Sequence, residues 1–275
     1  MRLSYGSQRQ SAATSALWLV AICSCLVMGP ARADESVELA KKLANPIANL
    51  ISVPIKLDWD TGIGSNDADQ YNFVIQPVIP FSLNSDWSLI SRTIAPFIEA
   101  KAPQPGLSDE SGLGDITQSF FFSPKAPTAG GWIWGAGPVL LLPTATNDRL
   151  SGEKWGLGPT VVMLKQDSGW TYGMLANHIW SVAGTDSRND ISNTFLQPFL
   201  SFTTKQATTY SVNTESTYNW QESQWTVPIN VQLSQLTRLS GQPVSFAIGT
   251  RFYAERPAGG PDWGLRFTVT LLLPK

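Results

Sequence analysis

His178 is the only histidine in the chain, so any reaction that needs an imidazole must use it. A hydrolase with a serine nucleophile or a carboxylate-supported base would need this imidazole for proton transfer. No serine stands two positions after His178, as a His-x-Ser arrangement would require. We therefore interpret His178 as a structural or interfacial histidine and predict no catalytic residues. A hydrolase that uses His178 is the less favoured alternative.

Oxygen-bearing side chains gather in one short stretch, which makes it a candidate metal site. They are Asp58, Asp60, Asn66, Asp67 and Asp69. Their spacing does not reproduce the calcium-loop pattern of alternating oxygens, a central glycine and a terminal glutamate. Both cysteines, Cys23 and Cys25, lie in the N-terminal apolar stretch. We predict neither a metal site nor a bound cofactor.

Charged and amide side chains recur on the polar face of extended segments. If these segments close into a barrel, the side chains face its lumen. Both signs of charge are present, so they either form a narrow polar channel or fill the lumen with ion pairs. The predicted pore-lining residues are Lys56, Asp58, Asp60, Asn72, Gln76, Gln197, Asn213, Glu215, Asn230, Gln232, Arg251 and Arg266.

These side chains lie on segments that alternate between apolar and polar residues from Leu50 onward, as half-buried strands do. In one clear case the apolar and polar residues alternate over 224–234, with Trp225, Val227, Ile229, Val231 and Leu233 against Gln224, Thr226, Asn230, Gln232 and Ser234. About twelve such segments begin near Leu50, Tyr71, Trp87, Gly114, Trp132, Lys154, Trp170, Thr194, Thr209, Gln224, Val244 and Trp263. We predict an all-β fold, a transmembrane antiparallel up-and-down β-barrel, because a soluble sandwich would expose a very large apolar surface.

The connections between segments support this interpretation, because tight and longer ones alternate. Residues 84–86, 166–169 and 205–208 are tight, whereas 61–70, 102–113, 144–153 and 185–193 are longer and polar. The rule weakens at 221–223, which is short, and at 237–243, which is long.

Tryptophans stand at the ends of the segments, where a membrane barrel carries its aromatic girdles. The predicted girdle residues are Trp59, Trp87, Trp132, Trp155, Trp170, Trp180, Trp220, Trp225 and Trp263. Tryptophans that fill a soluble core would instead occupy the middle of the segments.

Prolines inside the segments fit the barrel badly, because each removes a donor from the hydrogen-bond ladder and a closed barrel has no edge strand. We therefore expect bulges, or strands that end near Pro54, Pro77, Pro80, Pro96, Pro138, Pro159, Pro198 and Pro228. The pattern leaves open which way Arg92 and His178 face.

The N-terminus has the features of a secretory signal peptide: a basic start, an apolar run over 16–28 and the Ala31-Arg32-Ala33 site. We predict cleavage after Ala33. Residues 34–49 then form a helix capped by Ser36 and ended by Pro46, at the periplasmic mouth. Residues 50–275 form the barrel.

Composition excludes other classes. Only 15% of the 275 residues are charged and the formal net charge is −2, whereas an average domain carries about 25% charged residues and a nucleic-acid-binding protein clusters basic ones. No nucleic-acid partner is expected. No apolar run suits a helical membrane protein with several spans.

Several motifs together resemble a family of bacterial outer-membrane proteins named for the MetA pathway of phenol degradation, some of them mislabelled neuromedin U. They include Leu43-Ala44-Asn45-Pro46-Ile47, Gln76-Pro77-Val78-Ile79-Pro80, Ala176-Asn177-His178-Ile179-Trp180-Ser181 and Pro261-Asp262-Trp263-Gly264. The resemblance implies a Gram-negative outer-membrane barrel classed as a transporter, with hydrophobic or aromatic compounds as candidate substrates and no established catalytic residues.

The function we predict is a porin-like, non-enzymatic passive channel or transporter for small molecules in the outer membrane. Its expected partners are outer-membrane lipid and lipopolysaccharide, the barrel-assembly machinery and a small solute. A non-conducting structural or adhesive protein is the first alternative, and a hydrolase that uses His178 is the second.

Overall fold

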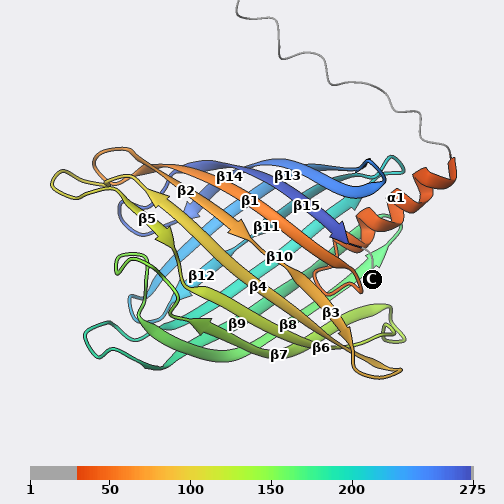
Figure 1. The fold of residues 1–275 in the computed structure, drawn as a ribbon, viewed down its shortest axis with the longest axis horizontal. Helices are drawn as coiled ribbons and strands as arrows, with labels where there is room; N and C mark the ends of the chain where they lie inside the picture. Colours follow the sequence, from red (N-terminus) through yellow and green to blue (C-terminus); the bar gives the residue numbers. More distant parts are fainter. Residues whose placement is uncertain (1–29, 274–275) are drawn as a thin grey trace, which may run out of the picture.

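The computed structural model describes residues 30–273, most of which lie in strands of one antiparallel sheet that closes on itself (Figure 1). Alternating apolar and polar residues put one face of each strand outward and the other inward. The elements are α1 (Pro30–Leu43), β1 (Ile51–Ile63), β2 (Ala68–Ile75), β3 (Val78–Ser82), β4 (Trp87–Ala100), β5 (Glu110–Leu113), β6 (Ile116–Pro124), β7 (Trp132–Leu142), β8 (Lys154–Asp167), β9 (Trp170–Gly184), β10 (Ser192–Thr203), β11 (Thr208–Thr214), β12 (Ser216–Asn219), β13 (Gln224–Leu239), β14 (Gln242–Glu255) and β15 (Trp263–Leu273).

The strands form a closed barrel of 12 spans, as the sequence predicts. Each span pairs with its neighbours in sequence, and the first strand, β1, pairs with the last, β15. Three spans are interrupted, so that β2 and β3, β5 and β6, and β11 and β12 each make one span. Closure leaves no span without a partner on either side.

Prolines explain where the three spans break, because a proline has no N–H to give to the neighbouring strand. The N–H groups of Gln76, Gly114 and Glu215 lie at the breaks and donate to the carbonyl oxygens of Pro54, Pro96 and Pro228 at 2.9, 2.8 and 3.4 Å. The register of β13 against β14 also shifts at Val227 and Pro228. The ladder is thus interrupted beside these prolines without opening an edge.

The two ends of the barrel differ (Figure 1). One end, here called the turn end, carries α1, the C-terminal end of β15 and the short turns such as 168–169 between β8 and β9. The opposite end, the loop end, carries the longer connections 101–109, 143–153 and 185–191. The predicted alternation of tight and longer connections holds for most of the chain, but 64–67 and 220–223 at the loop end are short and 125–131 at the turn end is longer.

Two connections are shorter than the sequence indicated. The expected loop 61–70 is mostly strand, and residues 64–67 alone join β1 to β2, because Gly64 and Asp67 have positive φ angles of 67° and 52°. The expected long connection 237–243 is a two-residue turn at Ser240 and Gly241, with φ angles of 50° and 88°.

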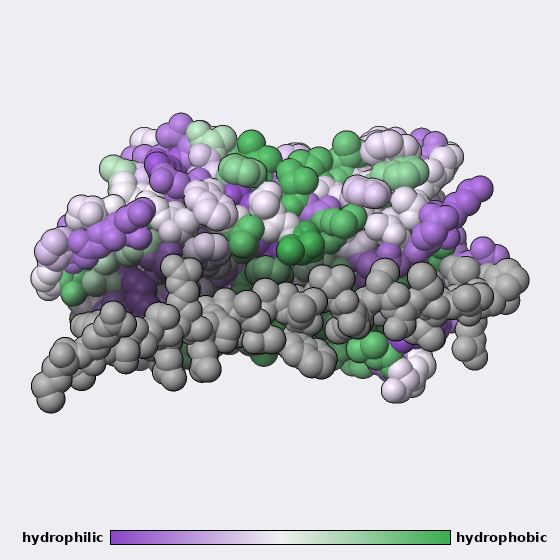
Figure 2. All heavy atoms as spheres, turned by 90° about the horizontal axis from the view of Figure 1, so that it is seen from above, coloured by the Kyte–Doolittle hydropathy of each residue, from purple (hydrophilic) through white to green (hydrophobic). Residues whose placement is uncertain are grey.

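The outer face of the wall is apolar. Leu57, Phe97, Met163, Val231 and Phe267 are among many large hydrophobic side chains exposed there. On the face seen in Figure 2, hydrophobic side chains gather along the middle of the wall and hydrophilic ones toward its two ends. Within residues 30–273, no helix has the length and apolar character needed to cross a membrane.

The predicted helix over 34–49 is displaced toward the N-terminus: α1 covers Pro30–Leu43, and Ser36 lies inside it and does not cap it. It ends early because Pro46 disfavours a helical residue before it. The Asn45 side chain instead accepts the Ile47 N–H at 3.0 Å, which makes a turn. We call α1 and the turn residues 44–50 the plug segment. The predicted signal peptide lies mainly in residues 1–29, outside the described residues.

The plug segment packs against the inner wall at the turn end. Ala40 is buried with Ala207, Leu236 and Leu272, which come from the β10–β11 turn, β13 and β15. Two polar contacts reinforce this packing: the Gln166 side chain donates to the Lys41 carbonyl at 2.8 Å, and Arg238 pairs with Glu35 at 2.7 Å. A helix this short needs such tertiary contacts to be stable.

Candidate functional site

The lumen is the candidate site, because strand alternation directs the polar side chains there. All predicted pore-lining residues lie opposite the exposed apolar face, in strands or at the breaks between them: Lys56, Asp58, Asp60, Asn72, Gln76, Gln197, Asn213, Glu215, Asn230, Gln232, Arg251 and Arg266. Residues distant in the sequence therefore meet on one inner surface.

Arg266 is the centre of a buried ion-pair network. Its Nε and Nη2 donate to the two oxygens of Asp58 at 2.6 and 2.8 Å. Nη2 and Nη1 also reach the carboxylate of Glu215, at 2.8 and 3.1 Å. Asp58 and Arg266 are directly opposite each other in the β1–β15 ladder. Such forked, charge-assisted contacts fix the geometry of both partners.

Arg251 extends the network along β14. Its Nη1 lies 2.8 Å from Asp58 and 3.4 Å from Asp60. Asp60 has room on the wall because its cross-strand partner is Gly264, where a Cβ atom would collide with the Asp60 carboxylate. The guanidinium also lies 5.4 Å from the centre of the Tyr253 ring, within cation–π range. Two arginines therefore hold three carboxylates.

Two further cations face the same lumen without such partners. Lys56 and Arg92 form no ion pair within residues 30–273, and the buried Nε of Arg92 has no hydrogen-bond partner there. Arg92 lies inside with Ile90 on β4, which resolves the orientation that the sequence left open. The network itself has one more carboxylate than guanidinium, and Lys56 and Arg92 add two positive charges beside it, both within the electrostatic influence of Glu215.

Amides complete the polar surface. The Asn230 side chain donates to the Asn213 oxygen at 2.9 Å, and Gln197 donates to Glu215 at 3.5 Å. The side-chain oxygens of Asn72, Gln76 and Asn230 are buried without a partner among the described residues. Buried acceptors of this kind are normally satisfied by water or a bound molecule.

An apolar cluster inside the barrel was missed by sequence reasoning. Ile90, Phe121, Val162, Leu164 and Leu175 are at most 1% exposed, and they pack with Val78 and with Ile47 of the plug segment. Inward apolar residues interrupt the alternation, so β8 reads Val161-Val162-Met163-Leu164 with no polar face. The signal available was this continuous run together with a helix that needs a docking surface.

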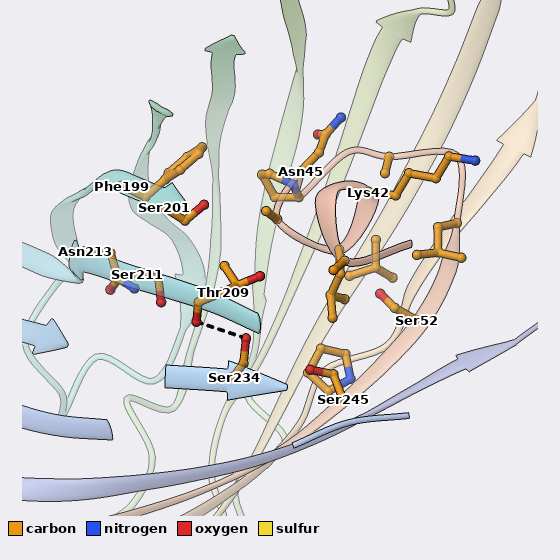
Figure 3. A pocket seen from close by; sticks show the side chains of 18 of the residues that line it. Lys42, Asn45, Ser52, Phe199, Ser201, Thr209, Ser211, Asn213, Ser234 and Ser245 are labelled. Carbon is orange, nitrogen blue, oxygen red and sulfur yellow. Dashed lines mark hydrogen bonds between the residues drawn. The ribbon is translucent and has the colours of Figure 1, made fainter. Parts of the chain in front are cut away.

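A cavity of about 280 Å³ lies between the plug segment and the network. In Figure 3, Lys42 and Asn45 of the plug segment lie on one side, with hydroxyl-bearing residues of the wall around the space. One of them, Ser234, donates to the Thr209 carbonyl at 3.5 Å. Lys56, Gln76, Arg92, Gln197 and Asn213 also line the cavity. We call this cavity the chamber.

The loops at the loop end are tied to one another. Asp115, at the break between β5 and β6, accepts the Gly152 N–H at 2.8 Å and the Ser151 hydroxyl at 3.1 Å. Arg188 pairs with Glu153 at 2.6 Å. The Ala102 N–H and Lys101 both bond Asp109, and these contacts lower the pKa of Asp109 below its ordinary value. Loop 143–153 is thus tied to the β5–β6 break and to loop 185–191, and loop 101–109 is closed on itself.

His178 lies on the outer face of β9, away from the network. Its Nδ1 is 2.7 Å from the Thr194 hydroxyl, and its Nε2 is 3.4 Å from the Ser192 hydroxyl. Its ring packs against Trp180, with ring centroids 4.1 Å apart. The Trp220 indole N–H donates to Thr194 at 2.8 Å. His178 is therefore part of a cluster of aromatic and hydroxyl side chains near the loop end.

The predicted girdle tryptophans lie at strand ends in two groups. Trp87, Trp132 and Trp170 begin strands at the turn end; Trp59, Trp155, Trp180, Trp220, Trp225 and Trp263 lie toward the loop end. Several are paired edge to face, as Trp59 and Trp263 are with centroids 5.5 Å apart.

Comparisons with known proteins agree with this architecture. Residues 56–274 match a family described as "Putative MetA-pathway of phenol degradation". The fold is similar to that of an outer membrane channel from Pseudomonas putida F1, with a TM-score of 0.63, 15% identity, and coverage of 82% of this chain and 96% of that one. Outer membrane phospholipase A from Escherichia coli is less similar, with a TM-score of 0.48, 11% identity, and coverage of 86% and 98%. No curated protein sequence matches the chain.

Proposed function

Since this chain belongs to the MetA-pathway of phenol degradation family and has the fold of an outer-membrane barrel channel, we propose that it is a passive conduit for small molecules. The substrates would cross the outer membrane without chemical change. Hydrophobic or aromatic compounds are the candidate class that the family's description supports.

One observation carries this proposal: a chamber lined by both polar and apolar side chains lies inside the barrel, between the plug segment and the ion-pair network. A barrel that served only as a rigid structure would be expected to satisfy its interior polar groups completely. Here Lys56 and Arg92 lack ion-pair partners, and buried amide oxygens lack hydrogen bonds among the described residues. A lumen with free donors and acceptors is suited to water and solutes.

The proposed orientation places the turn end in the periplasm and the loop end outside the cell, as in barrels with short periplasmic turns. Residues 1–33 would be removed on export, leaving residues 34–49 to close the periplasmic mouth and 50–275 as the barrel. Outer-membrane lipid and lipopolysaccharide would contact the apolar wall and the two tryptophan groups. The barrel-assembly machinery would insert the chain.

Electrical recording from planar bilayers tests the conduit directly. We expect purified mature protein to give discrete current steps and to let small neutral sugars enter liposomes, because the polar lumen provides a hydrated route. The control is unfolded protein, which is recognised by its altered mobility on a gel after heating. If neither the mature chain nor the chain that begins at Leu50 gives current or sugar uptake, and both are verified as folded, the proposal is contradicted and a structural barrel is favoured.

The contacts of His178 define the competing function, because a serine hydroxyl near Nε2 and an orienting group at Nδ1 are what a hydrolase needs. We expect His178→Ala to leave conductance unchanged, since His178 lies on the outer face, where its side chain contacts Thr194, Ser192 and Trp180. Ester hydrolysis by the unmodified protein should be absent in the same preparation. Hydrolysis that disappears in both His178→Ala and Ser192→Ala would instead establish an enzyme.

A further inference from the structure

Lys56 and Arg92 are two cations on the wall of one chamber. Neither forms a close ion pair among the described residues, and the Glu215 carboxylate, which is already bonded to Arg266, attracts both at longer range. We propose that the chamber binds a small organic anion with an apolar body, and that Lys56 and Arg92 hold its anionic group. This inference names a substrate class for the conduit and in that sense rests on the proposed function. Binding itself is measured without transport.

The charges around the chamber favour an anionic ligand. Asp58, Asp60 and Glu215 carry three negative charges, and all three are bonded to Arg251 or Arg266. Lys56 and Arg92 bring the cations in this part of the lumen to four, and the exposed Lys42 of the plug segment adds a fifth at the edge of the chamber. Positive charge is therefore in excess, and a buried charge without a counter-charge is unfavourable.

Arg92 supplies the most specific part of the site. Arg92 is 8% exposed, and its side chain borders the chamber. Its Nε is buried and has no hydrogen-bond partner among residues 30–273. A guanidinium offers several donors in a plane that matches a carboxylate. A donor left unpaired in a buried position costs free energy that a bound anion would remove.

The rest of the chamber favours an apolar body over a bare inorganic ion. Leu43 and Leu50 of the plug segment, and Val78 and Phe199 of the wall, line the same space. Figure 3 shows Phe199 beside the chamber, together with hydroxyl-bearing side chains. The volume of about 280 Å³ lies just below the usual range for ligand pockets, which suits a molecule with a single ring.

Calorimetric titration of the purified full chain in detergent tests the site, with benzoate as probe and benzyl alcohol as its neutral counterpart. We expect benzoate to bind and benzyl alcohol to bind much more weakly. Arg92→Gln should weaken benzoate binding by about tenfold or more, because it removes a charged hydrogen-bonding partner. Arg92→Lys should retain part of the affinity.

The matched control is Arg149→Gln, which alters a loop-end arginine paired with Glu110. This variant should bind benzoate as the unmodified chain does.

The results separate this inference from the proposed function. Equal binding of benzoate and benzyl alcohol, no benzoate binding by a folded chain, or unchanged affinity in Arg92→Gln would each overturn the anion site. The comparison of the two probes needs no variant, so the test survives if Arg92→Gln does not fold. Benzoate binding by a barrel that passes no current would support the site and contradict the conduit. Current through a barrel that does not bind benzoate would support the conduit and contradict the anion site.

Discussion

Deleting residues 34–49 is expected to raise the single-channel conductance of the barrel by about tenfold or more, because flow through a pore depends on its narrowest open section. The plug segment contacts opposite parts of the mouth. Ile47 packs with Phe121 and Leu164, and Ala40 packs with Leu236. Its removal therefore exposes the chamber to the turn end. The measurement is current in planar bilayers for the mature chain and for the chain that begins at Leu50.

A milder variant and a control sharpen this test. Ile47→Ser should give an intermediate conductance, because it removes the apolar contact with the cluster and leaves α1 in place. Glu38→Gln alters an exposed residue of α1 whose one ion pair among residues 30–273 is with Lys41, and it should have no effect. If the shortened barrel is folded by heat-modifiable mobility and its conductance equals that of the mature chain, the plug segment does not close the mouth.

Replacing Arg266 with methionine should lower the free energy of unfolding by about 3–5 kcal/mol, the usual cost of removing one partner from a buried ion pair. The variant leaves Glu215 without its arginine and leaves Asp58 with Arg251 alone. Arg266→Lys keeps the charge but loses the forked contact, so we expect an intermediate loss. Denaturant unfolding of the barrel in lipid or detergent measures both.

The control for this prediction is Arg149→Met. Arg149 pairs with Glu110 at 2.7 Å, but its side chain is 45% exposed, so its loss should cost less than about 1 kcal/mol. Equal destabilisation by Arg266→Met and Arg149→Met would show that the buried network contributes no more than a surface pair.

Strand alternation predicted most of the barrel because it depends only on neighbouring residues. The segments begin close to the expected positions, and the predicted lumen residues share one face. Tight turns at 64–67 and 240–241 were missed because they depend on positive φ angles at Asp67 and Ser240, which polar residue types alone do not specify.

The interior could be predicted only in part, because it depends on contacts between distant segments. The sequence indicated that Asp58, Glu215 and Arg266 face inward, but their mutual pairing follows from the register of strands far apart in the chain. The apolar cluster was hidden because Val162 and Leu164 have apolar neighbours on the outer face as well. The pattern of neighbouring residues does not specify whether an apolar side chain faces the lipid or the plug segment.

The position of the network between the first and last strands has a consequence for assembly. Arg266 and Asp58 are 208 residues apart, and Arg251 and Asp60 are 191 apart. Contacts between such distant residues carry the largest loop-closure cost, so hairpins such as β8–β9 can form long before β1 meets β15. Asp58 and Asp60 of β1 therefore meet Arg251 and Arg266 only when the final seam closes. Until that step, an incomplete sheet carries separated buried charges, which makes a prematurely closed barrel with fewer spans unfavourable.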